Sequence, residues 1–127
     1  KNGVITVFGG NQTRPNIHIK DITNVYRHFL SKKDIPSGCY NAGFENISIL
    51  EIAKMVANKV NTELVISKSN DPRSYRQDST KLLRTGYVPQ YSVEKAIEEI
   101  ICEYDKGDLE ETNMAYTVRW MKHLNLN

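Results

Sequence analysis

The sequence predicts a mixed α/β chain, an α+β arrangement with few short strands and several capped helices. Short runs rich in β-branched residues end at glycines or polar turns, which is typical of strands. Longer segments behind a Ser or Asp carry apolar residues at spacings of three and four, which is typical of capped amphipathic helices. Because the strands are short and outnumbered by the helical segments, we do not expect a complete sheet.

The N-terminal segments are predicted to be a strand, a second extended stretch and a helix. Val4–Phe8 is β-branched and aromatic and runs into two glycines, which predicts a strand that ends in a turn. The proline after Arg14 disfavours helix at that arginine, and Asn16–Ile19 is expected to be extended. Asp21 is the expected N-cap of the helix that follows. The apolar stripe of this helix comprises Ile22, Val25, Tyr26, Phe29 and Leu30.

The middle of the chain is predicted to contain two strands around one helix. Ser31–Gly38 is a lysine-rich surface loop, and Cys39–Ala42 is a candidate strand. Ser48 and Glu51 form a capping box that opens a helix. One face of this helix carries Ile49, Ile52, Ala53, Val56 and Val60. Leu64–Ile66 is a short β-branched strand.

The last part of the chain is predicted to be a loop followed by helices. Lys68–Gln77 is polar and rich in turn formers. Asp78 or Ser79 caps a short helix that stops at Gly86, and Ser92 caps the next one. The expected buried face of that next helix is Val93, Ala96, Ile97, Ile100 and Ile101. A final helix over Leu109–Leu124 carries Met114, Val118 and Met121 on one stripe, with Trp120 nearby.

The composition is that of one globular domain spanning residues 1–127, with 39% hydrophobic and 25% charged residues. A net charge of +2 is too small for the basic patch that nucleic acid or an anionic membrane requires, and no apolar run reaches the ~20 residues of a membrane-spanning helix. The sequence shows no signal-peptide pattern, so we expect a cytoplasmic protein without nucleic-acid or membrane partners. Cys39 and Cys102 are isolated and are expected to be reduced thiols.

No catalytic or metal-binding constellation is evident in the sequence. The histidines have no ligand spacing between them: His18, His28 and His123. Tyr91 and Lys95 spell a Tyr-x-x-x-Lys string, whose chemistry needs both side chains on one helix so that the ammonium lowers the phenol pKa. Because Ser92 is the expected cap, Tyr91 lies outside the helix, and the string is interpreted as a chance occurrence. We therefore predict no catalytic residue and no metal site.

The two glycines after the first strand do not predict a cofactor loop. A dinucleotide fingerprint needs three spaced glycines that run directly into a helix. Here residues 11–15 and a second extended stretch follow Gly9 and Gly10. These glycines are predicted to form a turn, and we expect the chain to bind no NAD(P).

Two arginine-bearing runs, Arg14–Ile22 and Asp71–Tyr87, hold the best candidate binding residues. A planar guanidinium can grip the phosphates of a nucleotide diphosphate bidentately. Arg73 and Arg76 lie three apart in a turn-rich loop, with Tyr75 available to stack on a base or sugar. The residues alone leave open a second interpretation, in which this is a solvated charged loop.

Several linked blocks resemble the C-terminal part of the extended short-chain dehydrogenase/reductase family, the NAD-dependent nucleotide-sugar epimerases and dehydratases. VFGGNQTRPNIHIKDITNVY resembles that family's V-[FY]-G-x-G-x-x-x-R-x-[FY]-[IV]-[HY]-V-x-D block. YNAG at Tyr40–Gly43 resembles its [YF]-N-[IV]-G strand, and DPRSYRQDSTKLLRTGYVPQYSVEKAIEEI resembles its R-x-x-D-x-x-K-[IAL]-x-x-x-L-G-[YFW]-x-P block and the helix beyond. The blocks occur in the family's order over nearly the whole chain. Thr85 replaces the usual leucine before glycine, and Ala96 stands near a usual glycine, which affects packing more than ligand contact.

The resemblance implies the substrate-binding portion of a larger enzyme whose Rossmann half is missing. In the family that half binds NAD(P) and supplies the catalytic Ser/Thr, Tyr and Lys, while the smaller part binds a nucleoside-diphosphate-sugar. The parent enzyme would then be an isomerase or lyase of polysaccharide biosynthesis, and this chain alone would not be catalytic.

Residue by residue, the resemblance assigns diphosphate contacts to the arginines. Arg14 matches one diphosphate arginine, and Arg76 or Arg73 matches the second, with Arg76 nearer the motif's aspartate. Gln12 and Asn11 lie where loop residues meet the nucleotide or sugar. Tyr75 is a further candidate for that contact.

The resemblance also implies an exposed surface, because the first helix and the last one lie against the Rossmann half in the family. Without that half the stripe of Ile22, Val25 and Phe29 loses its partner. We expect the chain to self-associate as a homo-oligomer or to rearrange its terminal elements. The alternatives are a stand-alone nucleotide- or sugar-phosphate-binding module and a non-catalytic interaction domain.

Overall fold

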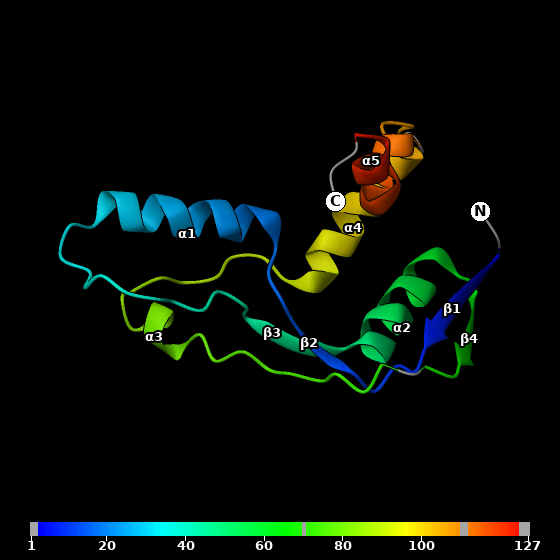
Figure 1. Ribbon diagram of the computed structural model, residues 1–127, viewed down its shortest axis with the longest axis horizontal. Helices are drawn as coiled ribbons and strands as arrows, with labels where there is room; N and C mark the ends of the chain where they lie inside the picture. The colour runs from blue at the N-terminus through cyan, green and yellow to red at the C-terminus, as the bar shows by residue number, and fades with distance from the viewer. Residues whose placement is uncertain (1–2, 70, 110–111, 125–127) are drawn as a thin grey trace.

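The computed structural model describes residues 3–69, 71–109 and 112–124 and confirms the predicted mixed α/β class. In chain order the elements are β1 Val4–Phe8, β2 Thr13–Asn16, α1 Ile19–Ser31, β3 Glu45–Ser48, α2 Ile49–Val60, β4 Glu63–Ser67, α3 Thr80–Leu83, α4 Val93–Asp105, a 3₁₀ turn η1 Asn113–Ala115 and α5 Thr117–His123. Figure 1 shows an elongated molecule with β1, β4 and α2 at one end and α1 and α3 at the other.

The strands of the described residues form two separate two-stranded sheets, so the expected lack of a complete sheet is confirmed. Strands β1 and β4 run parallel, from Val4 opposite Glu63 to Phe8 opposite Ser67. Strands β2 and β3 run antiparallel, with Pro15 opposite Asn46. A proline is tolerated there because each strand of a pair has a free edge on which no N–H is needed for the ladder.

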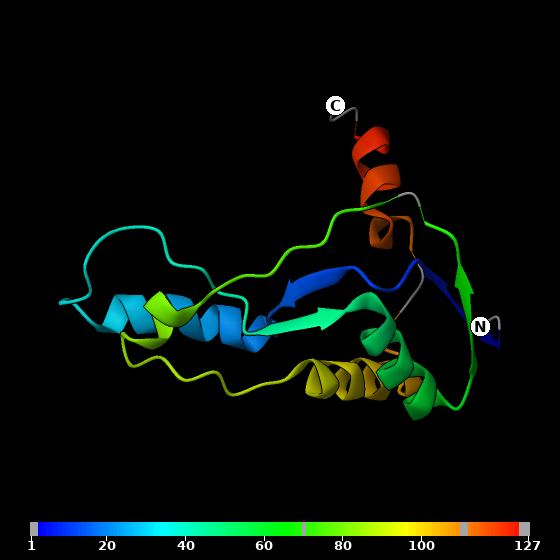
Figure 2. The same cartoon turned by 90° about the horizontal axis from the view of Figure 1, so that it is seen from below.

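Helix α2 joins the two sheets, since it lies against β1, β3 and β4 and also contacts α4. Figure 2 shows α2 and α4 side by side below β1 and β3. The buried residues at this junction are Val7 on β1, Ala53 and Ala57 on α2, and Ile97 on α4. The two alanines are small, so the helix can approach its neighbours closely.

Local capping signals are confirmed at both long helices that the serines were expected to open. Ser48 and Glu51 form the full capping box, with Ser48 N donating to Glu51 Oε2 at 3.0 Å and Glu51 N donating to Ser48 Oγ at 3.2 Å. The Ser48 hydroxyl, which donates to Glu51 Oε2 at 2.7 Å, and the Ser48 N–H hold the pKa of Glu51 below its usual range. Ser92 Oγ accepts from Lys95 N at 3.1 Å at the start of α4.

The prediction for residues 16–21 was wrong in register. The second extended segment is Thr13–Asn16, and α1 begins at Ile19 rather than after Asp21. His18 is the N-cap, because its Nδ1 accepts from Lys20 N at 3.1 Å. Asp21 lies inside the helix and is fully buried, so its carboxylate is committed to tertiary contacts.

The candidate strand Cys39–Ala42 was also wrong, and the strand lies a few residues later at Glu45–Ser48. The backbone C=O and N–H groups at the two ends of this segment form hydrogen bonds with side chains and not with a neighbouring strand. Lys81 Nζ donates to Cys39 O at 2.9 Å, and Gly43 N donates to Ser79 Oγ at 3.0 Å. A β-branched or aromatic run becomes a strand only where another strand accepts its hydrogen bonds.

Two expectations about the C-terminal helices were wrong. Ile100, placed on the buried face of α4, is 60% exposed, because only Ile97 of that helix is buried. The last helix does not begin at Leu109: η1 is followed by the short α5, and Val118 on it is exposed. Among the described elements α5 packs chiefly against η1, so little apolar surface is available to bury the predicted stripe and stabilise a longer helix.

Helix α1 leaves most of its apolar surface uncovered. Asp21 is its single buried residue, whereas Tyr26 and Leu30 are 68% and 85% exposed. Between α1 and loop 31–42 lies an apolar groove of about 490 Å³, lined by Ile22, Val25, Phe29, Ile35, Tyr40 and Ala42 among others. Of the helices that the structure describes, none is long and apolar enough to cross a membrane.

Candidate functional site

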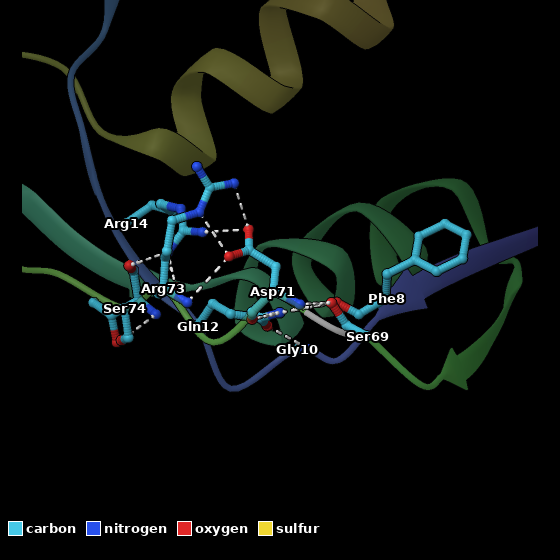
Figure 3. Close-up of polar contacts among 9 residues, drawn as sticks. Phe8, Gly10, Gln12, Arg14, Ser69, Asp71, Arg73 and Ser74 are labelled. Carbon is cyan, nitrogen blue, oxygen red and sulfur yellow. Dashed lines mark hydrogen bonds and ion pairs between the residues drawn. The ribbon is translucent and has the colours of Figure 1, made fainter.

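The loop after β4 lies along β2 and brings the two arginine runs together (Figure 3). Thr13 N donates to Ser74 Oγ at 3.0 Å, and Tyr75 N donates to Thr13 O at 3.2 Å. Because β3 occupies only one edge of β2, the other edge is free to hold this loop. Arg14 and Arg73, 59 residues apart, thereby become neighbours.

Gln12 fastens the β1–β2 turn to the loop. Its Oε1 accepts from Gly10 N at 2.7 Å, and its Nε2 lies 3.3 Å from both Phe8 O and Asp71 O. Gly9 has a φ of +80°, and a Cβ there would lie 2.6 Å from Gln12 Nε2, so glycine is required under this amide. The Gln12 amide is therefore committed to the protein, while the neighbouring Asn11 is exposed.

Arg14 is held in a fixed orientation. Its Nη1 donates to Thr13 O at 3.0 Å and to the carbonyl of Arg73. Its guanidinium carbon lies 4.7 Å from the centre of the Tyr75 ring, a cation–π contact. Its Nη2 faces Asp71 Oδ2 at 3.4 Å. The side chain is 22% exposed, so its remaining donors are open to solvent at one edge.

Arg73 binds the same carboxylate as Arg14. Its Nε and Nη2 donate to the two Asp71 oxygens at 2.7 and 2.9 Å, a bidentate pair. These bonds, with the charge of Arg14 behind them, lower the pKa of Asp71 to about 2. The role of Asp71 was not predicted from the sequence, and the available signal was an Asp two residues before an Arg, across a proline.

Arg76 is the arginine of this loop that has no ion-pair partner among the described residues. Within residues 3–69, 71–109 and 112–124, no group forms a hydrogen bond or ion pair with its guanidinium, which is exposed. Three guanidinium groups and one carboxylate give this loop a positive surplus. Such a surface can bind an anion that bears more than one charge.

The residues present do not fit a dinucleotide cofactor. The glycines after β1 lead into β2, not into a helix N-terminus, and the Gln12 amide fills the turn. Tyr91 lies outside α4 as expected and stacks on His18 at 4.7 Å, while Lys95 Nζ contacts Glu98 at 3.5 Å. The tyrosine and the lysine therefore form no catalytic pair. In the described part of the chain, no three His, Cys, Asp or Glu side chains are placed to hold a metal ion.

Sequence reasoning missed a buried polar node that links α1 to α4. Tyr87 Oη donates to Asp21 Oδ1 at 2.8 Å, and the N–H groups of Gln90 and Tyr91 donate to the same carboxylate at 3.0 to 3.2 Å. Burial, reinforced by Asp21, raises the pKa of Tyr87. The available signal was the spacing, since Asp21 lies four residues before Val25 and therefore on the apolar face of α1.

No family model and no curated protein matches the chain. Among solved structures, the chain is similar to RMD from Pseudomonas aeruginosa complexed with NADPH. The match has a TM-score of 0.70 and 19% identity and covers 84% of this chain. The chain spans 37% of the length of the RMD chain. At this identity the similarity establishes the fold alone.

Proposed function

We propose that this chain is the nucleotide-sugar-binding portion of an NAD(P)-dependent nucleoside-diphosphate-sugar epimerase or dehydratase. The observation that carries the proposal is the convergence of Arg14 and Arg73 on one anionic group. Arg76, which is exposed, belongs to the same loop. A pair of guanidiniums that grips a carboxylate has the donor geometry that a diphosphate requires. Tyr75 lies next to these donors and offers a ring face to a base or sugar.

The fold similarity supports the proposal from a second direction. The similar protein was solved with NADPH and is considerably longer than this chain. In the proposed parent enzyme the cofactor and the catalytic residues belong to the part that this chain lacks. The chain alone then binds no NAD(P) and carries out no chemistry.

The exposed face of α1 distinguishes this proposal from a stand-alone binding module. Tyr26 and Leu30 are more exposed than apolar side chains of a self-sufficient domain usually are, and the groove beside them is apolar. We assign this face to the absent Rossmann half, as the family resemblance implies. An independent module would have no reason to keep this face uncovered.

The test is an NMR titration of the isotope-labelled chain with UDP-, dTDP-, GDP- and CDP-sugars and, separately, with NAD⁺. We expect one nucleotide-sugar to shift the resonances of residues 11–14 and 71–76, with weak affinity because half of the enzyme is absent, and NAD⁺ to shift none. Tight NAD⁺ binding would contradict the proposal. If none of the four nucleotide-sugars shifts any resonance, the result would favour the alternative of a non-catalytic interaction domain.

A further inference from the structure

We propose that the Asp71 carboxylate is a built-in counter-ion that occupies the phosphate position between Arg14 and Arg73 and that an incoming diphosphate displaces. This inference rests on the proposed function and concerns how that same site selects its ligand. Figure 3 shows the carboxylate facing both arginine side chains, with a dashed contact to each.

The first argument is that Arg14 is oriented by contacts that do not involve Asp71. Two carbonyl groups hold Nη1, and the Tyr75 ring lies against the guanidinium plane. The contact with Asp71 is the longest of its polar contacts, at 3.4 Å from Nη2. Removing the carboxylate therefore leaves Arg14 in place with a free donor edge.

The second argument is that the Asp71 side chain can leave without disturbing its backbone. The backbone N–H donates to Ser69 Oγ at 3.1 Å, and the backbone carbonyl accepts from Gln12. Among the described residues, the side-chain oxygens bind the guanidiniums of Arg14 and Arg73 and the exposed backbone N–H of Arg73, which donates to Oδ1 at 3.1 Å and which water can solvate once the carboxylate leaves. Rotation of the side chain would expose both guanidiniums while the loop stays attached to the turn.

The third argument concerns the strength of the Asp71–Arg73 ion pair compared with that of a diphosphate contact. The Arg73 side chain is 75% exposed, and solvent-exposed ion pairs are weak, so the internal pair is easily broken by a stronger anion. One carboxylate carries one charge, whereas a diphosphate carries several and is attracted more strongly by two guanidiniums. The Asp71 carboxylate would therefore compete successfully with small monoanions but not with diphosphates, which makes Asp71 a determinant of ligand specificity.

The experiment compares Asp71→Asn with Asp78→Asn. Both substitutions remove one negative charge from the same segment, and an asparagine at residue 78 can still accept from Thr80 N, as Asp78 Oδ1 does at 2.8 Å. The probes are inorganic pyrophosphate and orthophosphate, measured by NMR titration at fixed ionic strength. We expect Asp71→Asn to bind pyrophosphate about threefold to tenfold more tightly than the unsubstituted chain, and orthophosphate with a larger gain. Asp78→Asn should change either affinity less than twofold.

A second measurement needs no variant. In the unsubstituted chain, pyrophosphate should shift the Asp71 carboxyl carbon and the Arg73 Nε–H resonance together as the pair separates. If the chain binds pyrophosphate but Asp71→Asn binds it no better, or the Asp71 carboxyl does not respond, the counter-ion inference is overturned while the proposed function stands. If neither form responds to pyrophosphate or to any nucleotide-sugar, both are overturned.

Discussion

The arginines of the site differ in how firmly the protein holds them. Arg14 is fixed by two carbonyls and a tyrosine ring, Arg73 is tied to a carboxylate two residues away, and Arg76 is exposed. A pre-oriented guanidinium loses less side-chain entropy when it binds a ligand than a mobile one does. Arg14 should therefore contribute most to binding per contact, and Arg76 mainly attracts the anion.

Replacing Arg14 with Ala should weaken nucleotide-sugar binding by about one to two orders of magnitude. A charge-assisted hydrogen bond contributes roughly 1.5–3 kcal/mol, and about 1.4 kcal/mol is tenfold. Arg14→Lys should recover only part of the loss, because an ammonium cannot reproduce the planar fork. Calorimetry on the complete parent enzyme would measure both effects, with unchanged NAD(P) affinity as the control.

Replacing Arg76 with Ala should likewise reduce nucleotide-sugar affinity roughly tenfold or more in the parent enzyme. Arg73→Ala is its matched comparison on the same loop. If only Arg73→Ala weakens binding, the second diphosphate arginine is Arg73. If neither variant differs from the unsubstituted enzyme, the loop is a solvated surface turn.

The ion pair at Asp71 should persist to strongly acidic pH. Its pKa is lowered in the folded chain from the usual 3.8 to about 2, mainly by hydrogen bonds from Arg73. A group with a lowered folded pKa stabilises the fold fully above its unfolded pKa, and this contribution is lost as pH falls from about 4 to about 2. An NMR titration of the Asp71 carboxyl carbon should give a midpoint near 2. Arg73→Ala should raise that midpoint only part of the way towards 3.8, because the backbone N–H of residue 73 and the charge of Arg14 still lower the pKa. A midpoint near 4 in the unsubstituted chain would show that the pair does not form in solution.

At the scale of elements, the helices are attached in two different ways. Helix α2 is held by apolar burial, through Ala53 and Ala57 against the sheets. Helix α1 buries no apolar residue completely, and its attachment depends on the fully buried Asp21 carboxylate and the groups that donate to it. Substitutions destabilise the two helices for different reasons. Loss of an apolar contact at α2 opens a cavity, whereas loss of the buried acceptor at α1 leaves hydrogen-bond donors unsatisfied.

Asp21→Ala should destabilise the chain by about 2–4 kcal/mol, because three donors lose their buried acceptor. Tyr87→Phe removes one donor only and should cost about 1 kcal/mol. Urea unfolding followed by circular dichroism would measure both. Asp34→Ala in the exposed loop is the control and should change stability by less than about 0.5 kcal/mol; an equal loss in all three variants would contradict the role of the Asp21 node.

At the scale of the whole molecule, apolar surface remains uncovered at both ends. Leu30 and Tyr26 are exposed on α1, and Phe8 and Ile66 are exposed on the parallel pair β1 and β4. Parallel strands are ordinarily covered on both faces. In the described residues, α2 covers one side of this pair and only short segments lie elsewhere.

The isolated chain should therefore self-associate. Burial of apolar area stabilises an interface by roughly 25 cal/mol per Å², so a few hundred Å² from α1 is enough to drive weak association. Light scattering at tens of micromolar should give a mass above that of one chain. The double variant Tyr26→Glu and Leu30→Glu should reduce this mass, whereas Val65→Glu on β4 separates a contribution of the sheet from that of α1. A monomer that binds no apolar dye would contradict the prediction.

The sequence predicted those features of the fold that depend on residues close together in the chain. The serine caps at Ser48 and Ser92 were predictable because each cap and its partner lie three residues apart. The start of α1 was not predictable, because the Asp21 carboxylate accepts hydrogen bonds from donors 66 to 70 residues away and does not cap the helix. Cys39–Ala42 was a candidate strand closed by a glycine, but among the described residues no strand pairs with it, and four residues do not carry that information.

The same limit applies to the candidate site. The sequence predicted a role for Arg14 and for Arg76 or Arg73, with Arg76 preferred, and the resemblance to a family implied that they share one site. That Asp71 would neutralise both could not be predicted, since it depends on the loop lying along the free edge of β2. The commitment of the Gln12 amide to the turn is likewise a tertiary outcome.

Because the groups that donate to Asp21 lie far along the chain, the elements should fold in a fixed order during translation. Strand β1 can pair with β4 as soon as residue 67 has left the ribosome, which closes a unit with α2 between them. At that moment Tyr87 and Gln90 have not yet emerged, so the Asp21 carboxylate is still hydrated and α1 has no anchor. Helix α1 docks only when the segment leading into α4 arrives. A chain released after residue 86 should accordingly protect the amides of β1 and β4 from hydrogen exchange while those of α1 exchange freely.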